Sequence, residues 1–117
     1  MKRVVITGIG MLSSLGVGVD EIWPKIKEGT SGVNFLKKVD ASDLKTKFGA
    51  EVPEDFNPEE FMDAKEARRS DPFIRFAVAA AALALKDSKL EITDDNSHLV
   101  GSYIGSGIGG IQTFVDN

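Results

Sequence analysis

The feature that most limits how this chain can fold is an apolar run that turns into a glycine-dense loop. Residues 99–111 read LVGSYIGSGIGGI, so bulky apolar side chains give way to Gly105, Gly107, Gly109 and Gly110. An apolar run without polar alternation is typical of a strand covered on both faces. Closely spaced glycines let the backbone take positive φ values and bring main-chain N–H groups near a bound molecule. We therefore expect a buried strand that delivers a loop to a site at the edge of an open α/β sheet.

A first buried strand is predicted near the N-terminus. Residues 3–11 (RVVITGIGM) are rich in β-branched side chains and end in two spaced glycines, as central strands often do. Gly8 and Gly10 resemble the start of a dinucleotide-binding fingerprint, but Ser13 stands where its third glycine belongs, and the related Thr-Gly pattern fails at positions 12 and 14. A nucleotide-binding α/β domain is therefore kept only as an alternative, which a rise of the Tm with NAD or ATP tests.

A short helix is predicted from Val19 to Glu28, because apolar side chains recur there at helical spacing, acidic residues lead and lysines trail. Gly29 supplies its C-terminal stop. Pro24 has no N–H to donate, so the helix either starts nearer Ile22 or is kinked at the proline. We expect Trp23 to anchor the core.

A longer helix is predicted from Phe73 to about Asp87, after the cap-and-proline signal of residues 70–72. Its apolar arc is wider than the stripe of an ordinary surface helix, and the segment is rich in alanine. Such a helix needs cover on more than one side. The other predicted elements are too few and too short for this, so we expect downstream chain or a partner subunit to complete the cover.

The remaining segments give weaker signals. Residues 32–39 are predicted to be extended, and residues 41–52 stay unassigned. A cap and a proline at residues 57–58 favour a short helix as far as residue 61 or 64. Residues 94–98 are predicted to form a solvated turn.

Charge and cysteine content exclude several functions. The chain of 117 residues has 14 basic and 18 acidic side chains, so it offers no general surface for nucleic acid or an anionic membrane. It has no cysteine, which removes disulfides, thiolate metal sites and a thiol nucleophile from this chain. The single His98 cannot form a metal cluster by itself, and its polar turn predicts an exposed side chain. No apolar run reaches the roughly 18 residues of a membrane span, and no signal-peptide core follows Met1, so we expect a cytoplasmic protein.

Several segments together carry a family resemblance over essentially all 117 residues. The chain resembles the N-terminal portion of β-ketoacyl-acyl carrier protein synthases, closest to the synthase II type. The matching segments are RVVITGIGM at 3–11, Ser31-Gly32, DFN at 55–57, KEARR at 65–69 followed by Asp71 and Phe73-Ile74, and GSGIGG at 105–110. The chain departs from the family pattern at Ser14, where the family usually has proline, and at Pro24, which interrupts a helix.

The resemblance implies the fold and the reaction. The fold class is α/β, the N-terminal portion of a thiolase-like αβαβα fold that is incomplete in this chain, with residues 1–117 as the first part of a β-ketoacyl synthase domain. The full-length protein is expected to be a homodimer without cofactor or metal. It elongates fatty acyl chains by decarboxylative Claisen condensation of malonyl-acyl carrier protein with an acyl-enzyme. The family's nucleophilic cysteine and two histidines lie outside this chain, so it has no catalytic residue and is expected to be inactive alone.

The resemblance also implies roles for four side chains. Ile108 is expected to line the acyl pocket and limit chain length, although an isoleucine after a strand can simply be a core residue. Lys65, Arg68 and Arg69 are expected to dock the acidic acyl carrier protein. A charge run of this kind can also be a solvated helix face, but helical spacing of three and four residues presents the three cations together.

Two other functions stay open beside the synthase. One is a non-catalytic relative that binds carrier protein or determines chain length. The other is the nucleotide-binding domain introduced above. Loss of salt-sensitive binding on charge reversal at Arg68 and Arg69 tests the carrier-protein role.

Overall fold

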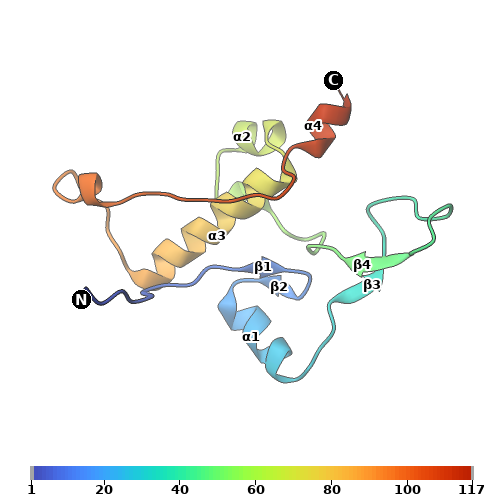
Figure 1. The fold of residues 1–117 in the computed structure, drawn as a ribbon, viewed down its shortest axis with the longest axis horizontal. Helices are drawn as coiled ribbons and strands as arrows, with labels where there is room; N and C mark the ends of the chain where they lie inside the picture. The colour runs from blue at the N-terminus through green and yellow to red at the C-terminus, as the bar shows by residue number, and fades with distance from the viewer. Residues whose placement is uncertain (1, 117) are drawn as a thin grey trace. The chain divides into compact units, whose positions relative to one another are not determined.

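A computed structural model describes residues 2–116 of the chain, apart from the side chains of Gln112 and Asp116. The strands are β1 (Leu12–Ser13), β2 (Gly16–Val17), β3 (Val33–Phe35) and β4 (Phe48–Ala50). The helices are α1 (Val19–Lys27), α2 (Ala64–Arg69), α3 (Pro72–Ser88) and α4 (Ile111–Asp116), with single 3-10 turns η1 (Pro58–Glu60) and η2 (Ser97–Leu99) (Figure 1). The chain divides into two compact units, of which one is residues 11–57 and the other joins the described residues before and after them.

In the unit of residues 11–57, a hairpin with strands of two residues each is hydrogen-bonded to α1. β1 and β2 pair antiparallel. The Glu21 carboxylate accepts a hydrogen bond of 2.9 Å from the Val17 N–H and one of 2.7 Å from Lys25 Nζ. Lys25 Nζ also donates to the Leu15 carbonyl at 2.6 Å. The hydrogen bond from Lys25, followed by that from Val17, lowers the pKa of Glu21 below its ordinary value.

Helix α1 confirms the prediction of a helix here and corrects two details. It begins at Val19 with Pro24 inside it, so a late start at Ile22 is wrong. Gly29 ends it with φ of 73°, and the N–H groups of Gly29 and Thr30 bond back into the last turn, as in a Schellman motif. Trp23 is not the core anchor, because its side chain is 52% exposed whereas Ile22 is 1% exposed. Neighbouring helical residues point about 100° apart, so only one of the two can face the hairpin.

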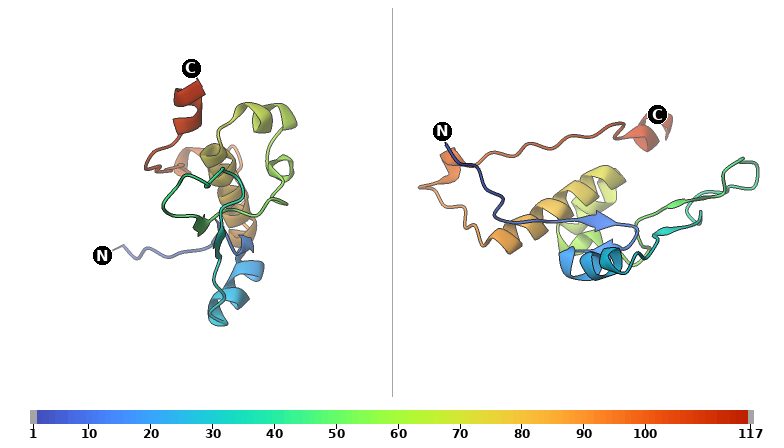
Figure 2. Two further views of the ribbon diagram at one scale, coloured as in Figure 1. Left: turned by 90° about the vertical axis from the view of Figure 1, so that its right-hand side faces the viewer. Right: turned by 60° about the horizontal axis from the view of Figure 1, so that its bottom comes forward.

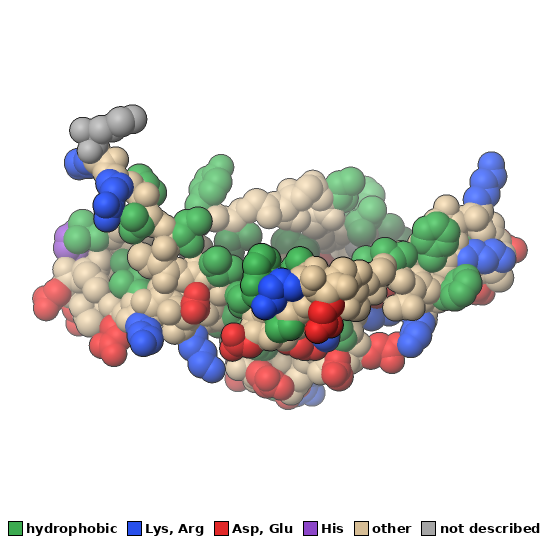
Figure 3. All heavy atoms as spheres, turned by 90° about the horizontal axis from the view of Figure 1, so that it is seen from below, with side chains coloured by type: hydrophobic (Ala, Val, Ile, Leu, Met, Phe, Trp, Pro, Cys, Tyr) green, Lys and Arg blue, Asp and Glu red, His purple; other side chains and the backbone are tan. Residues whose placement is uncertain are grey.

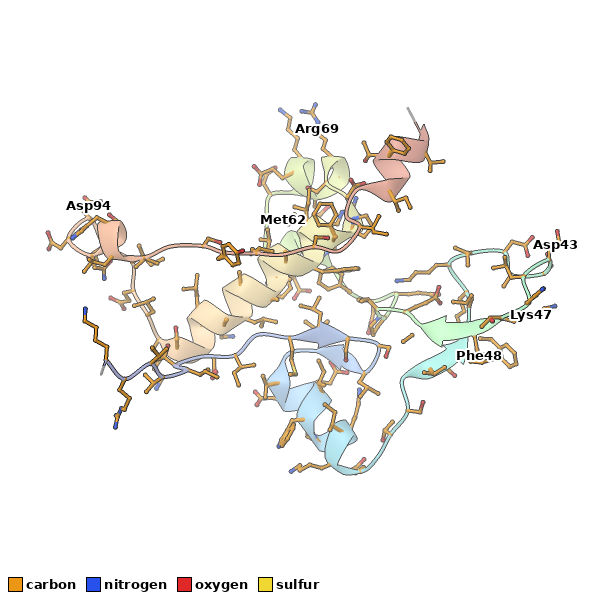
Figure 4. All side chains as sticks on the ribbon, viewed as in Figure 1. Asp43, Lys47, Phe48, Met62, Arg69 and Asp94 are labelled. Atoms are coloured by element: carbon orange, nitrogen blue, oxygen red, sulfur yellow. The ribbon has the colours of Figure 1, made fainter. Side chains whose placement is uncertain are left out.

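The same unit contains a second hairpin. β3 confirms the extended segment predicted within residues 32–39, and β4 falls in the segment that stayed unassigned. They pair antiparallel with Phe35 opposite Phe48, and both side chains are exposed. Figure 4 labels Phe48 and Lys47 where this hairpin projects.

In the other unit, the long predicted helix is confirmed as α3, within one residue at each end. The helix expected after residues 57–58 is only the 3-10 turn η1. Helix α2 starts separately, because the Asp63 side chain accepts a hydrogen bond of 2.8 Å from the Lys65 N–H and so caps it.

The N-terminal segment lies against α3 through its two glycines. A Cβ atom on Gly10 would overlap the Ala80 carbonyl, and one on Gly8 would overlap the Ala84 carbonyl. The Ile9 N–H donates a hydrogen bond of 2.8 Å to the Asp87 carboxylate. The spaced glycines and the alanines of α3 therefore permit a close backbone approach, which accounts for both patterns without a nucleotide.

The two predicted buried strands are wrong for this chain. Residues 3–10 and 100–106 are extended but have no strand partner in the part of the chain that the structure describes (Figure 2). Val4 is 92% exposed and Tyr103 fully exposed. Both segments line one groove on α3 of about 570 Å³. An apolar run shows that a segment can be buried, but a strand also needs neighbours that accept and donate its backbone hydrogen bonds.

Helix α3 is only partly covered. Ala79 is buried, whereas Phe73, Ile74 and Leu85 are each more than a third exposed. Other apolar side chains also lie at the surface, and Figure 3 shows those on one face of the molecule in green. Among residues 2–116, no helix is long and apolar enough to cross a membrane.

Candidate functional site

The three predicted docking cations are carried together by α2. Lys65, Arg68 and Arg69 are all exposed, whereas Ala67 is buried on the inner side of the helix at 3% exposure. Arg68 Nε donates a hydrogen bond of 3.1 Å to the Ala64 carbonyl. Among the side chains that the structure describes, none of the three cations is paired with a carboxylate. Their charges are therefore open to solvent on one short helix.

An apolar groove lies beside these cations. It has a volume of about 730 Å³. Figure 4 shows Arg69 extending outward from α2, with Met62 lower down beside α3. The lining consists of apolar side chains from the segment after η1 and from α3, together with polar ones from α2 and its C-cap, namely Phe61, Met62, Ile74, Val78, Lys65, Glu66, Arg69 and Ser70. This arrangement places two cations, Lys65 and Arg69, and the Glu66 carboxylate beside apolar side chains. Sequence analysis identified only the cations.

The glycine loop lies on the first turn of α3. A Cβ atom on Gly109 would be 2.9 Å from two ring carbons of Phe73, and Gly110 has φ of 74°. Ile108 projects from this loop with 81% of its side chain exposed. It is therefore not a core residue in this chain, and the predicted acyl-pocket role stays a prediction.

The two groups of predicted site residues meet at the start of α3. Helix α2 ends at Arg69, three residues before α3 begins at Pro72. The loop that carries Ile108 contacts Asp71 and Phe73 at the same end of α3. Residues far apart in the sequence are thus brought to one end of one helix.

Sequence analysis missed the role of Asp71. Its position before Pro72 predicts a helix cap, and Asp71 is the N-cap residue of α3, but its side chain makes no capping hydrogen bond. The Thr113 hydroxyl instead donates a hydrogen bond of 2.7 Å to Asp71 Oδ1. No local pattern distinguishes these two uses of an aspartate.

The other titratable side chains in the described part of the chain form no candidate metal site. His98 lies at the surface, as predicted, on η2 (purple in Figure 3). In the described part of the chain, no three histidine or acidic side chains are grouped so that they could hold a metal ion.

Comparison with solved structures first defines the class. The chain matches a structure described as "The ishigamide ketosynthase/chain length factor" with a TM-score of 0.70 and 34% identity, over 81% of this chain and 23% of that one. The described residues therefore share part of a ketosynthase fold. Residues 1–116 match the family described as "Beta-ketoacyl synthase, N-terminal domain", and the chain belongs to this family.

Curated relatives agree with this assignment. The chain is 46% identical over 111 residues to a "3-oxoacyl-[acyl-carrier-protein] synthase 2" of Vibrio harveyi, and the matched region covers 95% of this chain and 26% of the relative. It is 46% identical over 116 residues to the protein of that name from Coxiella burnetii, and the matched region covers 99% of this chain and 28% of the relative. The chain thus spans about a quarter of the length of these relatives. The family resemblance is confirmed, and it is favoured over a nucleotide-binding domain.

Proposed function

We propose that this chain is the N-terminal part of a 3-oxoacyl-acyl carrier protein synthase. The full-length enzyme elongates acyl chains by decarboxylative condensation of malonyl-acyl carrier protein with an acyl-enzyme. The observation that carries the proposal is the 46% identity, across 95% of this chain, to a relative of that name. The proposal includes a complete thiolase-like αβαβα fold, a homodimer and a cytoplasmic location for the full-length protein. Condensation needs an activated nucleophile and oxyanion donors, and no residue of this chain is assigned either role.

Helix α2 is proposed as the docking site for the acyl carrier protein. Three exposed cations without carboxylate partners in the described residues support this role, because a positive patch steers an acidic partner and sets the register of the encounter. The adjoining groove of about 730 Å³ supplies apolar surface that a partner can cover. A local positive patch on a chain with a net charge of −4 also limits non-specific association.

Ile108 is proposed to limit the length of the acyl chain. The support is its place in the loop, where it is the bulky side chain between Gly107 and Gly109 and is largely exposed. A projecting branched side chain can contact an acyl tail and restrict the space beyond it.

The docking role is tested in the full-length protein by the double charge reversal R68E/R69E. We expect its affinity for acyl carrier protein to fall by about tenfold or more and to lose much of its salt dependence. The matched control K45E/K47E changes the net charge equally on the β3–β4 hairpin and is expected to leave affinity within about twofold. Equal affinities for the two double variants would overturn the role of α2.

A second candidate is a chain-length-determining relative without condensing activity. The likeness to the ishigamide protein, whose description pairs a ketosynthase with a chain length factor, is compatible with this candidate, but the relatives named as synthases do not favour it. The full-length protein, supplied with malonyl- and acyl-acyl carrier protein, distinguishes the two. Condensation supports the synthase, whereas binding without condensation supports the second candidate.

A further inference from the structure

The glycine loop contacts α3 just after Ile108, whereas the glycines just before Ile108 border open space. A Cβ atom on Gly105 or Gly107 would meet nothing within 4 Å. A Cβ atom on Gly109 would instead lie 2.8 Å from the Ser106 hydroxyl and 2.9 Å from the Phe73 ring. The contact with Phe73 therefore positions the loop directly beside Ile108.

Asp71 and Thr113 complete this attachment. The Thr113 hydroxyl, 42 residues along the chain, donates a hydrogen bond of 2.7 Å to Asp71 Oδ1. The other carboxylate oxygen, Oδ2, lies 3.1 Å from where a Cβ atom on Gly110 would be. Gly110 has φ of 74°, which a residue with a side chain rarely adopts. The loop thus turns tightly at Asp71 and is fastened just beyond the turn.

We propose that Asp71, Phe73 and Thr113 form a loop anchor that positions Ile108 and thereby tunes acyl-chain-length selectivity. This inference rests on the proposed role of Ile108. Asp71 and Thr113 act as positioning residues, because their role is to hold the loop, and the contact with the acyl chain is assigned to Ile108.

The physical reason is the low stiffness of the loop. Glycines on both sides of Ile108 leave many backbone conformations accessible, and fixing one of them has an entropic cost. A hydrogen bond two residues into α4, together with the Phe73 contact, reduces that freedom before the acyl chain arrives. When the anchor is released, Ile108 can move aside, and its restriction on long chains weakens.

The test compares T113V with T113S in the full-length protein. Valine removes the hydroxyl with little change in shape, whereas serine keeps the donor. Because the Thr113 side chain is exposed, neither change disturbs a core.

The measured quantity is the ratio of the condensation rate with a long acyl-acyl carrier protein to the rate with a short one. We expect T113V to raise this ratio by about two- to tenfold and T113S to stay within about twofold of the wild type. The unrelated variant T46V, in the loop between β3 and β4, is the control and is expected to change nothing.

Two further measurements separate the possible failures. I108A, assayed in the same way, tests the proposed function itself: an unchanged ratio removes the role of Ile108. If I108A changes the ratio and T113V does not, the loop anchor is overturned while the role of Ile108 stands. Amide hydrogen exchange of residues 105–110 is independent of activity. T113V is expected to accelerate it relative to T113S, and equal exchange in both variants likewise overturns the anchor.

Discussion

The backbone of Gly10 lies so close to Ala80 of α3 that a Cβ atom on Gly10 would overlap the Ala80 carbonyl. This contact seats the N-terminal segment on α3, together with the similar contact of Gly8 and the hydrogen bond from the Ile9 N–H to Asp87. Close backbone packing of this kind explains why a glycine motif that resembles a nucleotide-binding loop occurs where no such loop exists.

The substitution G10A is expected to lower the free energy of unfolding by about 1–3 kcal/mol, because the added methyl group forces the segment away from α3. Urea denaturation of the full-length protein measures this loss. The control is G101A, since a Cβ atom on Gly101 meets nothing within 4 Å. If the two variants are equally stable, Gly10 does not pack against α3.

The substitution I22A is expected to lower the free energy of unfolding by about 2–5 kcal/mol, because Ile22 is 1% exposed and truncation leaves a cavity under α1. The same change at Ile26 of this helix, which is 46% exposed, is expected to have less than half of this effect. Thermal unfolding monitored by circular dichroism compares the two. An equal loss would mean that α1 does not bury its Ile22 face.

The substitution E21Q is expected to make stability less dependent on pH. Hydrogen bonds from Lys25 and then from the Val17 N–H lower the pKa of the Glu21 carboxyl below its ordinary value of 4.5. Its stabilisation is therefore complete above that value and is lost as the pH falls through the lower pKa of the folded state. Because Glu21 is half exposed, the contribution is below about 1 kcal/mol.

Urea denaturation at about pH 7 and about pH 3 tests the Glu21 prediction. We expect E21Q to be less stable than the wild type at the higher pH and nearly equal to it at the lower one. E28Q, at the opposite end of the same helix, is the control, because no hydrogen bond of the Glu28 side chain is found among the described side chains. A constant difference between E21Q and the wild type at both pH values contradicts the prediction.

The substitution G29A is expected to destabilise α1 by about 1 kcal/mol for a reason different from that at Gly10. A Cβ atom on Gly29 meets nothing within 4 Å, so space is available, but φ of 73° disfavours alanine. G29N is the informative comparison, because asparagine tolerates this conformation better. A melting temperature that falls from the wild type to G29N and then to G29A supports the helix-ending motif. Equal melting temperatures for G29A and the wild type contradict it.

The candidate site was predictable only in part. The spacing of Lys65, Arg68 and Arg69 indicated a common helix face, and α2 has it. The groove beside them and the bond between Asp71 and Thr113 join segments that are distant in the sequence, so no local pattern could indicate them. The resemblance to the family assigned a role to Ile108, but the packing of its loop on Phe73 emerged only from the structure.

Helices α1 and α3, the stop at Gly29 and membership of the beta-ketoacyl synthase family could all be inferred from local residue patterns, because helical periodicity, caps and family motifs depend on residues near one another. The folded arrangement was needed to show that Ile22 and not Trp23 is buried, and that residues 3–10 and 100–106 are extended without strand partners among the described residues. Burial and strand pairing depend on which distant segments arrive alongside, and a local pattern contains no information about those neighbours.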